Sequence, residues 1–319
     1  MTRHRFAFPP SDDAIFLTDG GLETTLVFVE GLDLPCFAAF PLLRSVEGRG
    51  RLERYFEPYI RTAMERDVGF ILDTPTWRAN ADWGAKLNVS PEDLIVMNGD
   101  AVRWALSLRD RLSDERDRIL INGVVGPRGD GYRADAQMTV EEAQAYHAPQ
   151  LEAFRDAGGD MVSAITMNYA EEAIGIARAA KALSMPVVIS FTVETDGRLA
   201  SGETLRSAIE RTDRETGEAT AYYMINCAHP THFDDILSGR EEWTRRIRGL
   251  RANASVKSHA ELDESTELDP GDPVDLGRHY RRLRERMPQI SVLGGCCGTD
   301  HRHIAAICEA CMPPSGRSA

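Results

Sequence analysis

Two adjacent cysteines, Cys296 and Cys297, follow a short apolar run in the segment SVLGGCCGTD, residues 291–300. Adjacent cysteines rarely form a disulfide with each other, because the ring that they would close is strained. They are therefore either small buried side chains, as free cysteines often are, or soft ligands for a metal ion. A third cysteine would favour the metal, and Cys227 is a candidate because it ends the similar apolar run AYYMINC.

Three cysteine ligands would leave one coordination position of a zinc ion open. An open position is typical of catalytic zinc, whereas structural zinc is closed by a fourth protein ligand. The Gly294–Gly295 pair would let the backbone turn sharply, so that two successive cysteine side chains reach one ion. We therefore predict a Zn²⁺ site made by Cys227, Cys296 and Cys297, and we assign the same three residues to catalysis.

The remaining cysteines give weaker signals. Cys308 and Cys311 are spaced as CxxC in the segment HIAAICEAC, which predicts the last helix of the chain. A second metal site with His301 or His303 is one interpretation, but packing of this helix is favoured. Cys36 lies in a predicted loop and gives no signal of its own.

The elements that must position these cysteines follow from the hydrophobic pattern. Short apolar segments alternate with longer segments of helical periodicity, such as 51–67, where Leu52, Tyr55, Phe56 and Tyr59 recur on one face. Strands are expected over residues 14–18, 68–73, 118–124, 160–165, 186–193, 221–226, 247–253 and 289–294. Helices are expected over residues 51–67, 92–112, 139–157, 170–183, 203–212, 230–238, 274–286 and 301–310.

Eight strand–helix pairs with apolar strands predict an α/β fold of the (β/α)8 TIM-barrel type. No linker divides the chain, so we expect a single barrel domain over residues 1–319. In such a barrel the chemistry lies at the carboxyl ends of the strands. Cys227 ends the sixth predicted strand and the Cys296–Cys297 pair ends the eighth. The three thiols can therefore converge on either side of the seventh strand.

Composition excludes several classes of function. The 319 residues include only six cysteines, too few for a disulfide scaffold, and the net charge of −13 argues against a nucleic-acid-binding surface. The first residues, MTRHRFAFPPSDD, lack the apolar core of a signal peptide, and no segment reaches the ~18 apolar residues of a membrane span. We therefore expect a cytoplasmic protein that binds neither nucleic acid nor membrane, and we leave open whether it forms a homo-oligomer.

The segment after the seventh predicted strand, residues 254–273, contains six acidic residues. The favoured interpretation is a solvated surface loop. The alternative is a lid over the mouth of the barrel, because functional loops of this fold follow the strands.

Taken together, the motifs of the chain resemble those of the homocysteine S-methyltransferase family, which includes betaine- and S-methylmethionine-dependent enzymes. The cysteine pattern INC followed by GGCCGT carries the resemblance, together with LTDGGLETTL, ILDTPTWRAN, GVVGPRGDGY and RANAS. The resemblance covers nearly the whole chain. It implies a zinc-bearing (β/α)8 barrel, in agreement with the fold that the hydrophobic pattern predicts.

The resemblance further implies a zinc-dependent S-methyltransferase that moves a methyl group from a sulfonium or betaine-like donor to a small thiol. The default acceptor is homocysteine, and the reaction then belongs to methionine biosynthesis. Zinc would hold the acceptor as a thiolate, whereas a free thiol with a pKa of ~8.5 is mostly protonated at neutral pH. The expected partners are therefore a small-molecule thiol acceptor and a small-molecule methyl donor.

Seven positions at the ends of the predicted strands match substrate-binding motifs of the family. They are Asp19, Gly20, Gly21, Asp73, Thr74, Asn226 and Asn253. The resemblance implies that the backbone of the first three meets the amino acid part of the acceptor. It implies that the backbone amides of Asp73 and Thr74 receive a carboxylate, and that the two asparagines orient ligands. The alternative for each side chain is a cap or turn at a strand end.

One position departs from the family pattern. In the segment SAITMNYAEEA, Ile165 stands where the family has a glutamate that pairs with the ammonium group of homocysteine. A hydrocarbon cannot pair with a buried cation, and an unpaired buried charge is costly. Phe37 and Ala38 also stand where the family often has Trp and Ser. Two alternatives therefore stay open, namely a methyltransferase for a different small thiol and a zinc-bound barrel that binds a thiol or selenol or has a regulatory role.

Overall fold

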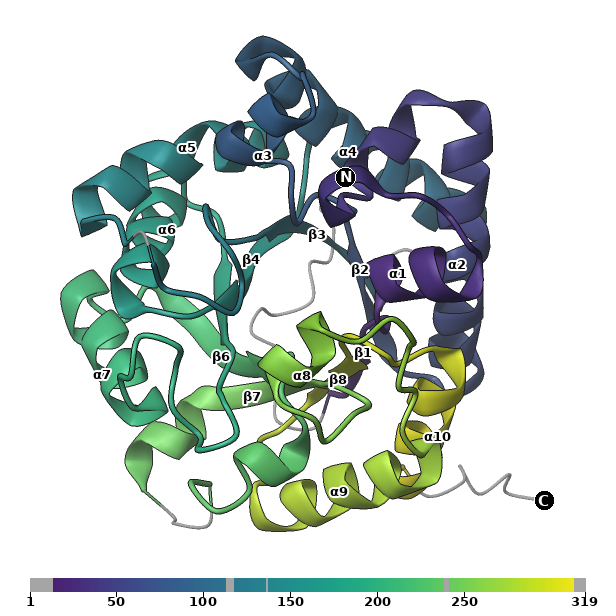
Figure 1. Cartoon of the computed structure of the whole chain (residues 1–319), viewed down its shortest axis with the longest axis vertical. Helices are drawn as coiled ribbons and strands as arrows, with labels where there is room; N and C mark the ends of the chain where they lie inside the picture. The colour runs from purple at the N-terminus through teal and green to yellow at the C-terminus, as the bar shows by residue number, and fades with distance from the viewer. Residues whose placement is uncertain (1–13, 113–117, 136, 238–240, 313–319) are drawn as a thin grey trace, which may run out of the picture.

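The eight strands of the computed structural model form one closed parallel barrel in chain order, as Figure 1 shows. The structure describes residues 14–112, 118–135, 137–237 and 241–312. The strands are β1 (Phe16–Leu17), β2 (Gly69–Asp73), β3 (Ile119–Val125), β4 (Met161–Met167), β5 (Val187–Phe191), β6 (Thr220–Asn226), β7 (Ile247–Ala252) and β8 (Val292–Gly295). Because β1 pairs with both β2 and β8, the sheet has no free edge. The (β/α)8 prediction is confirmed.

Seven longer helices surround the barrel in Figure 1 and cover the outer faces of the strands. They are α2 (Val46–Glu65), α4 (Pro91–Leu112), α5 (Val140–Asp156), α6 (Ala170–Ala182), α7 (Leu205–Thr216), α9 (Pro273–Arg286) and α10 (His301–Cys311). Their ends follow from local signals. Thr139 and Glu142 form a capping box at the start of α5, and Gly217 adopts the left-handed conformation, φ 61°, that ends α7.

The helix predicted over residues 230–238 is wrong. The structure has only a 3₁₀ turn, Pro230–His232, in this segment, and residue 238 lies outside the described residues. The backbone of Phe233, with φ −131° and ψ 0°, leaves the helical region and ends the turn. A second 3₁₀ turn, Glu242–Arg246, leads directly into β7. Three short helices that the periodicity did not predict are α1 (Leu22–Thr24), α3 (Ala81–Lys86) and α8 (His259–Asp263).

Buried side chains form two layers, as expected for a barrel whose strands alternate inward and outward. The larger cluster packs the strands against the helices. A smaller cluster comes from alternate strand positions and includes Phe16, Ile71, Val124, Met161, Ile165, Val188, Tyr222, Met224 and Val292. Nearer the carboxyl ends of the strands, buried polar residues replace these apolar ones, namely Asp73, Asn122, Asn226 and Arg251. Charged and polar side chains therefore join the apolar ones toward the mouth of the barrel.

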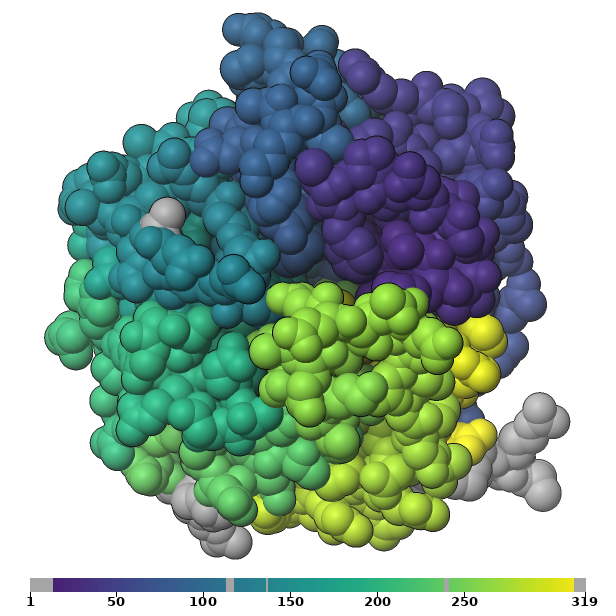
Figure 2. All heavy atoms as spheres, viewed as in Figure 1, coloured from purple at the N-terminus to yellow at the C-terminus, as the bar shows by residue number. Residues whose placement is uncertain are grey.

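The acidic segment 254–273 reaches the mouth of the barrel. It contains α8, and Leu262, Asp263 and Glu267 line the cavity described below. In Figure 2 this segment covers part of the central opening. Of the two sequence interpretations, a covering segment therefore fits the structure better than a loop that only meets solvent. Among the described residues no helix is both long and apolar enough to span a membrane.

Candidate metal and substrate site

A cavity of about 390 Å³ opens at the carboxyl ends of the strands, where the sequence predicts the chemistry. Its walls come from β4 and from the ends of β1, β2, β3, β6, β7 and β8 with the segments that follow them, and they include apolar side chains and several charged ones. Phe28, Phe37, Trp77 and Ile165 are among its large apolar side chains. Cys227, Cys296 and Cys297 also line this cavity, so any ligand of the cysteines would enter it.

The structure brings the three predicted cysteines together. Their Sγ atoms lie within 4.8 Å of one another, and those of Cys227 and Cys297 are 3.9 Å apart. Cys227 and Cys296 form a disulfide, with their Cα atoms 5.3 Å apart, which the sequence did not predict. Three soft sulfur atoms within reach of one ion fit the donor preference of zinc, once this disulfide is reduced.

Close backbone packing places the cysteines. The amide of Cys227 donates to the carbonyl of Arg251, and that of Cys296 donates to the carbonyl of Ala252. A Cβ on Gly294 would lie 1.8 Å from Thr18 Oγ1, and one on Gly295 would lie 2.0 Å from Thr299 Oγ1. The glycine pair is therefore required by this close approach of β8 to its neighbours, rather than by the sharp turn that the sequence suggested.

The surroundings of the cysteines include residues that sequence reasoning missed. The hydroxyl of Tyr132 lies 3.7 Å from Cys297 Sγ, and its ring stacks on that of His259 at a centroid distance of 4.1 Å. His259 contacts Glu194 at 2.9 Å, which fixes the imidazole. Burial raises the pKa of Cys297 to about 11, so this thiol is protonated at neutral pH in the absence of a metal. Tyr132 ends the segment GVVGPRGDGY, and nothing in the sequence alone links this aromatic residue to the cysteines.

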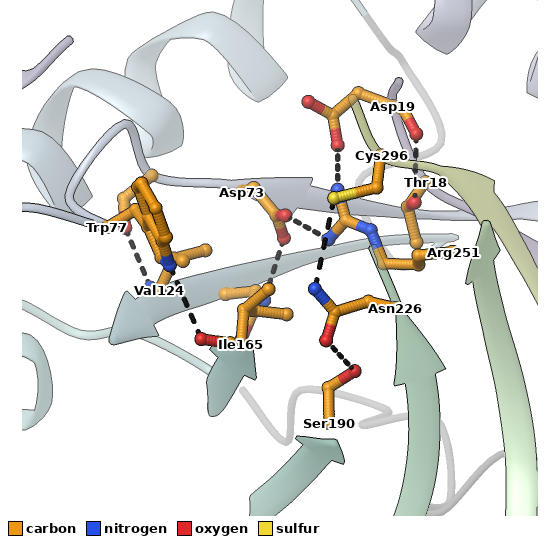
Figure 3. A network of polar contacts seen from close by, with 12 residues as sticks. Thr18, Asp19, Asp73, Trp77, Val124, Ile165, Ser190, Asn226, Arg251 and Cys296 are labelled. Carbon is orange, nitrogen blue, oxygen red and sulfur yellow. Dashed lines mark hydrogen bonds and ion pairs between the residues drawn. The ribbon is translucent and has the colours of Figure 1, made fainter. Parts of the chain in front are cut away.

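The carboxylates of Asp19 and Asp73 do not face the cavity as free groups, because both bind the guanidinium of Arg251 (Figure 3). Arg251 Nη2 lies 2.6 Å from Asp19 Oδ1, and Nη1 contacts Asp73 Oδ2. Asp19 also accepts a hydrogen bond from Tyr55, and Asp73 accepts one from Asn122. Burial and the neighbouring Asp73 raise the pKa of Asp19, against the opposing effect of Arg251. Arg251 is thus the second feature that sequence reasoning missed.

The resemblance implies that the backbone at Gly21 and Thr74 contacts a substrate. In this structure both amides donate hydrogen bonds within the protein. The amide of Thr74 donates to the carbonyl of Asn122 at 2.9 Å, and that of Gly21 donates to the carbonyl of Thr299 at 3.0 Å. In this structure the Thr74 amide continues the hydrogen bonding of β2 to β3. Gly20 packs closely, since a Cβ there would lie 2.7 Å from the carbonyl oxygen of Thr299.

The two predicted asparagines hold strand ends near the cysteines. Asn226 Oδ1 accepts from the Thr166 amide and from the Ser190 hydroxyl, and its Nδ2 lies 3.8 Å from Cys296 Sγ (Figure 3). Asn253 Nδ2 donates to the carbonyl of Cys227 at 3.0 Å. Both side chains therefore contact the cysteines, Asn226 at a sulfur and Asn253 at a backbone carbonyl.

Ile165 lines the cavity from the end of β4, with 7% of its surface exposed. Its carbonyl accepts a hydrogen bond from Trp77 Nε1 at 3.3 Å, so the backbone of β4 is fixed here (Figure 3). Among the cavity carboxylates, those of Asp19 and Asp73 are paired with Arg251, whereas Glu23 forms no ion pair with another described residue. Burial raises the pKa of Glu23 to about 7, so it is partly neutral at neutral pH.

Comparison with known proteins agrees with this geometry. The family model described as homocysteine S-methyltransferase matches residues 16–311. A homocysteine S-methyltransferase of Escherichia coli K12 is 27% identical over 225 residues, which cover 66% of this chain and 69% of that protein. Betaine–homocysteine S-methyltransferase 1 of Rattus norvegicus is 24% identical over 229 residues, which cover 66% of this chain and 53% of that protein.

Solved structures show the same fold. The oxidized form of the homocysteine methyltransferase MmuM from Escherichia coli has a TM-score of 0.71 and 21% identity, and covers 92% of this chain and 95% of that one. The metallated form of MmuM gives a TM-score of 0.69 at the same identity and coverage. At 21% identity this likeness shows the barrel fold alone.

Proposed function

The chain belongs to the homocysteine S-methyltransferase family, and from this premise we propose that it transfers a methyl group to the sulfur of a small thiol. Homocysteine is the default acceptor, with methionine as the product. The observation that carries the proposal is the convergence of three cysteine sulfurs on one substrate-sized cavity. In this proposal Cys227, Cys296 and Cys297 hold a zinc ion. When bound, zinc supplies a positive charge that keeps the acceptor sulfur deprotonated at neutral pH.

The residues of the chain would then position two substrates and exclude water. The acceptor sulfur attacks the methyl carbon of the donor, and the bond from that carbon to the donor sulfur or nitrogen breaks. Its electron pair leaves with the donor, so a sulfonium or ammonium donor departs as a neutral sulfide or amine. The aromatic rings of Phe28 and Phe37 in the cavity suit such a cationic donor, since a cation is attracted to the face of an aromatic ring.

The runner-up function is a zinc-bound barrel that binds a thiol or selenol, or regulates another process, without methyl transfer. Ile165 favours it, because the family glutamate is missing. Incubation of the reduced, zinc-loaded protein with thiols and either S-methylmethionine or betaine separates the two, with mass spectrometry of the products. A methylated thiol supports the methyltransferase, and binding of thiol without any methylated product supports the runner-up.

Replacing Ile165 by glutamate is expected to shift acceptor preference toward homocysteine. A charged hydrogen bond to the ammonium group is worth ~1.5–3 kcal/mol, or roughly 10- to 150-fold in affinity. Competition between homocysteine and 2-mercaptoethanol, measured for wild type and Ile165→Glu, checks this shift. Ile165→Gln is the matched control, since it has a similar size but no charge. Tight homocysteine binding by wild type that Ile165→Glu leaves unchanged would contradict the prediction and leave homocysteine as the acceptor.

A further inference from the structure

Arg78 is a buried charge without a counter-ion. It follows β2 in the segment ILDTPTWRAN, lines the cavity, and has 9% of its surface exposed. In the part of the chain that the structure describes, it forms no ion pair with a carboxylate. Burial lowers the pKa of Arg78, and the nearby acids Asp130 and Glu23 act on it only through space. Burying a guanidinium without an ion-pair partner costs folding free energy, which a bound anion would offset.

Two tryptophans hold the guanidinium in place. Arg78 Cζ lies 4.3 Å from the ring centroid of Trp77 and 3.6 Å from that of Trp83. Nη1 donates to the carbonyl of Gly129 at 3.3 Å, whereas the buried Nε has no hydrogen-bond partner. Stacking on both rings fixes the orientation of the side chain, but it leaves donors unused and the charge uncompensated.

Arg251 and two backbone amides of the cavity wall, which could otherwise receive an anion, already have partners. Arg251, the second arginine in the cavity wall, is matched by Asp19 and Asp73. The amides of Gly21 and Thr74 donate to backbone carbonyls. Arg78 is therefore the arginine of the described cavity wall that remains available to an anionic substrate group.

We propose that Arg78 binds the carboxylate of a substrate in this cavity, an inference that rests on the proposed function. A fixed guanidinium favours a planar carboxylate because it can donate two parallel hydrogen bonds to it. Ile165 offers no charge to an ammonium group, whereas Arg78 offers one to a carboxylate. The carboxylate belongs either to the acceptor, as in a mercapto acid, or to the donor, as in a betaine.

Equilibrium binding to reduced, zinc-loaded protein tests the site without requiring methyl transfer. In one arm, 3-mercaptopropionate competes with 3-mercaptopropanamide, and in the other, glycine betaine competes with its amide. Each pair has nearly the same shape and differs in the negative charge. Wild type is expected to prefer the carboxylate by roughly 10- to 150-fold in the arm that corresponds to the true source. Arg78→Gln should abolish this preference and leave the affinity for the amide unchanged.

Two further variants control for folding and charge. Arg78→Lys keeps the charge but loses the planar donor pair, so it should retain part of the preference. Arg206→Gln removes an arginine whose side chain is 53% exposed on α7, and should change nothing. Absence of a carboxylate preference by wild type in both arms, or an equal preference in Arg78→Gln, would overturn the site. Carboxylate preference without any methylated product would refute only the proposed function.

Discussion

Cys297→Ser is expected to lose its zinc on dialysis against a mild chelator, whereas reduced wild type keeps one zinc per chain. The substitution removes one of three soft ligands, and a hydroxyl does not replace a thiolate for zinc. Changes to residues that only support a metal ligand already cost 10- to 100-fold in affinity, so loss of a ligand should weaken zinc binding by more than about 100-fold. Metal content by plasma emission spectrometry measures the effect independently of enzyme activity.

Cys308→Ser is the matched control for this experiment. Cys308 lies on α10 and is buried, and among the described residues it belongs to no cluster of metal-ligating groups. The variant should therefore bind as much zinc as wild type. A reductant is required throughout, because the disulfide between Cys227 and Cys296 withdraws two of the three ligands. Full zinc content in Cys297→Ser would refute the three-cysteine site and redirect attention to Cys308 and Cys311.

The barrel could be predicted from the sequence because short apolar segments mark its strands and helical hydrophobic periodicity marks its helices. Each predicted strand overlaps an observed one, and the amphipathic segment 51–67 lies largely within α2. Segment 230–238 failed because its apolar residues suggest a helical face, whereas the backbone of Phe233 leaves the helical conformation after one turn. The short β1, Phe16–Leu17, could not be bounded from the sequence because its ends depend on pairing with β2 and β8.

The site could be predicted in part, for a similar reason. The cysteines end two strands of a parallel barrel, and that arrangement alone brings them to one face. The roles of Asp19 and Asp73 could not be predicted, because their partner Arg251 lies on β7 and meets them only when the barrel closes. One signal was available. Arg251 stands two positions after Gly249 in β7, on the same face of the strand, so the alternation of β7 points a charge into the barrel.

The Asp19–Arg251–Asp73 network predicts a large loss of stability on replacement of its arginine. Arg251→Met leaves two buried carboxylates without their cation, and removing one partner of a buried ion pair costs ~3–5 kcal/mol. Urea unfolding at pH 7.5 should therefore show a midpoint well below that of wild type. Arg206→Met removes exposed ion pairs with Glu210 and Glu241 and should cost less than ~1 kcal/mol.

The pH dependence of Arg251→Met distinguishes loss of a charge pair from loss of packing. Burial already raises the pKa of Asp19 to about 7 in the presence of the arginine, and its removal should raise this pKa further. The folded variant then holds protons that the unfolded chain, with a carboxyl pKa of ~3.9, releases. Wild type, with the pKa of Asp19 at about 7, loses stability in the same way between pH 4 and 7, whereas the variant continues to lose stability above pH 7. The difference between the two proteins should therefore be smaller at pH 4.5 than at pH 7.5. Adding Asp19→Asn and Asp73→Asn to Arg251→Met removes both stranded charges and should recover much of the loss. A penalty that is the same at pH 4.5 and pH 7.5 and that the two asparagines do not reduce would show that Arg251 stabilises the barrel by packing alone.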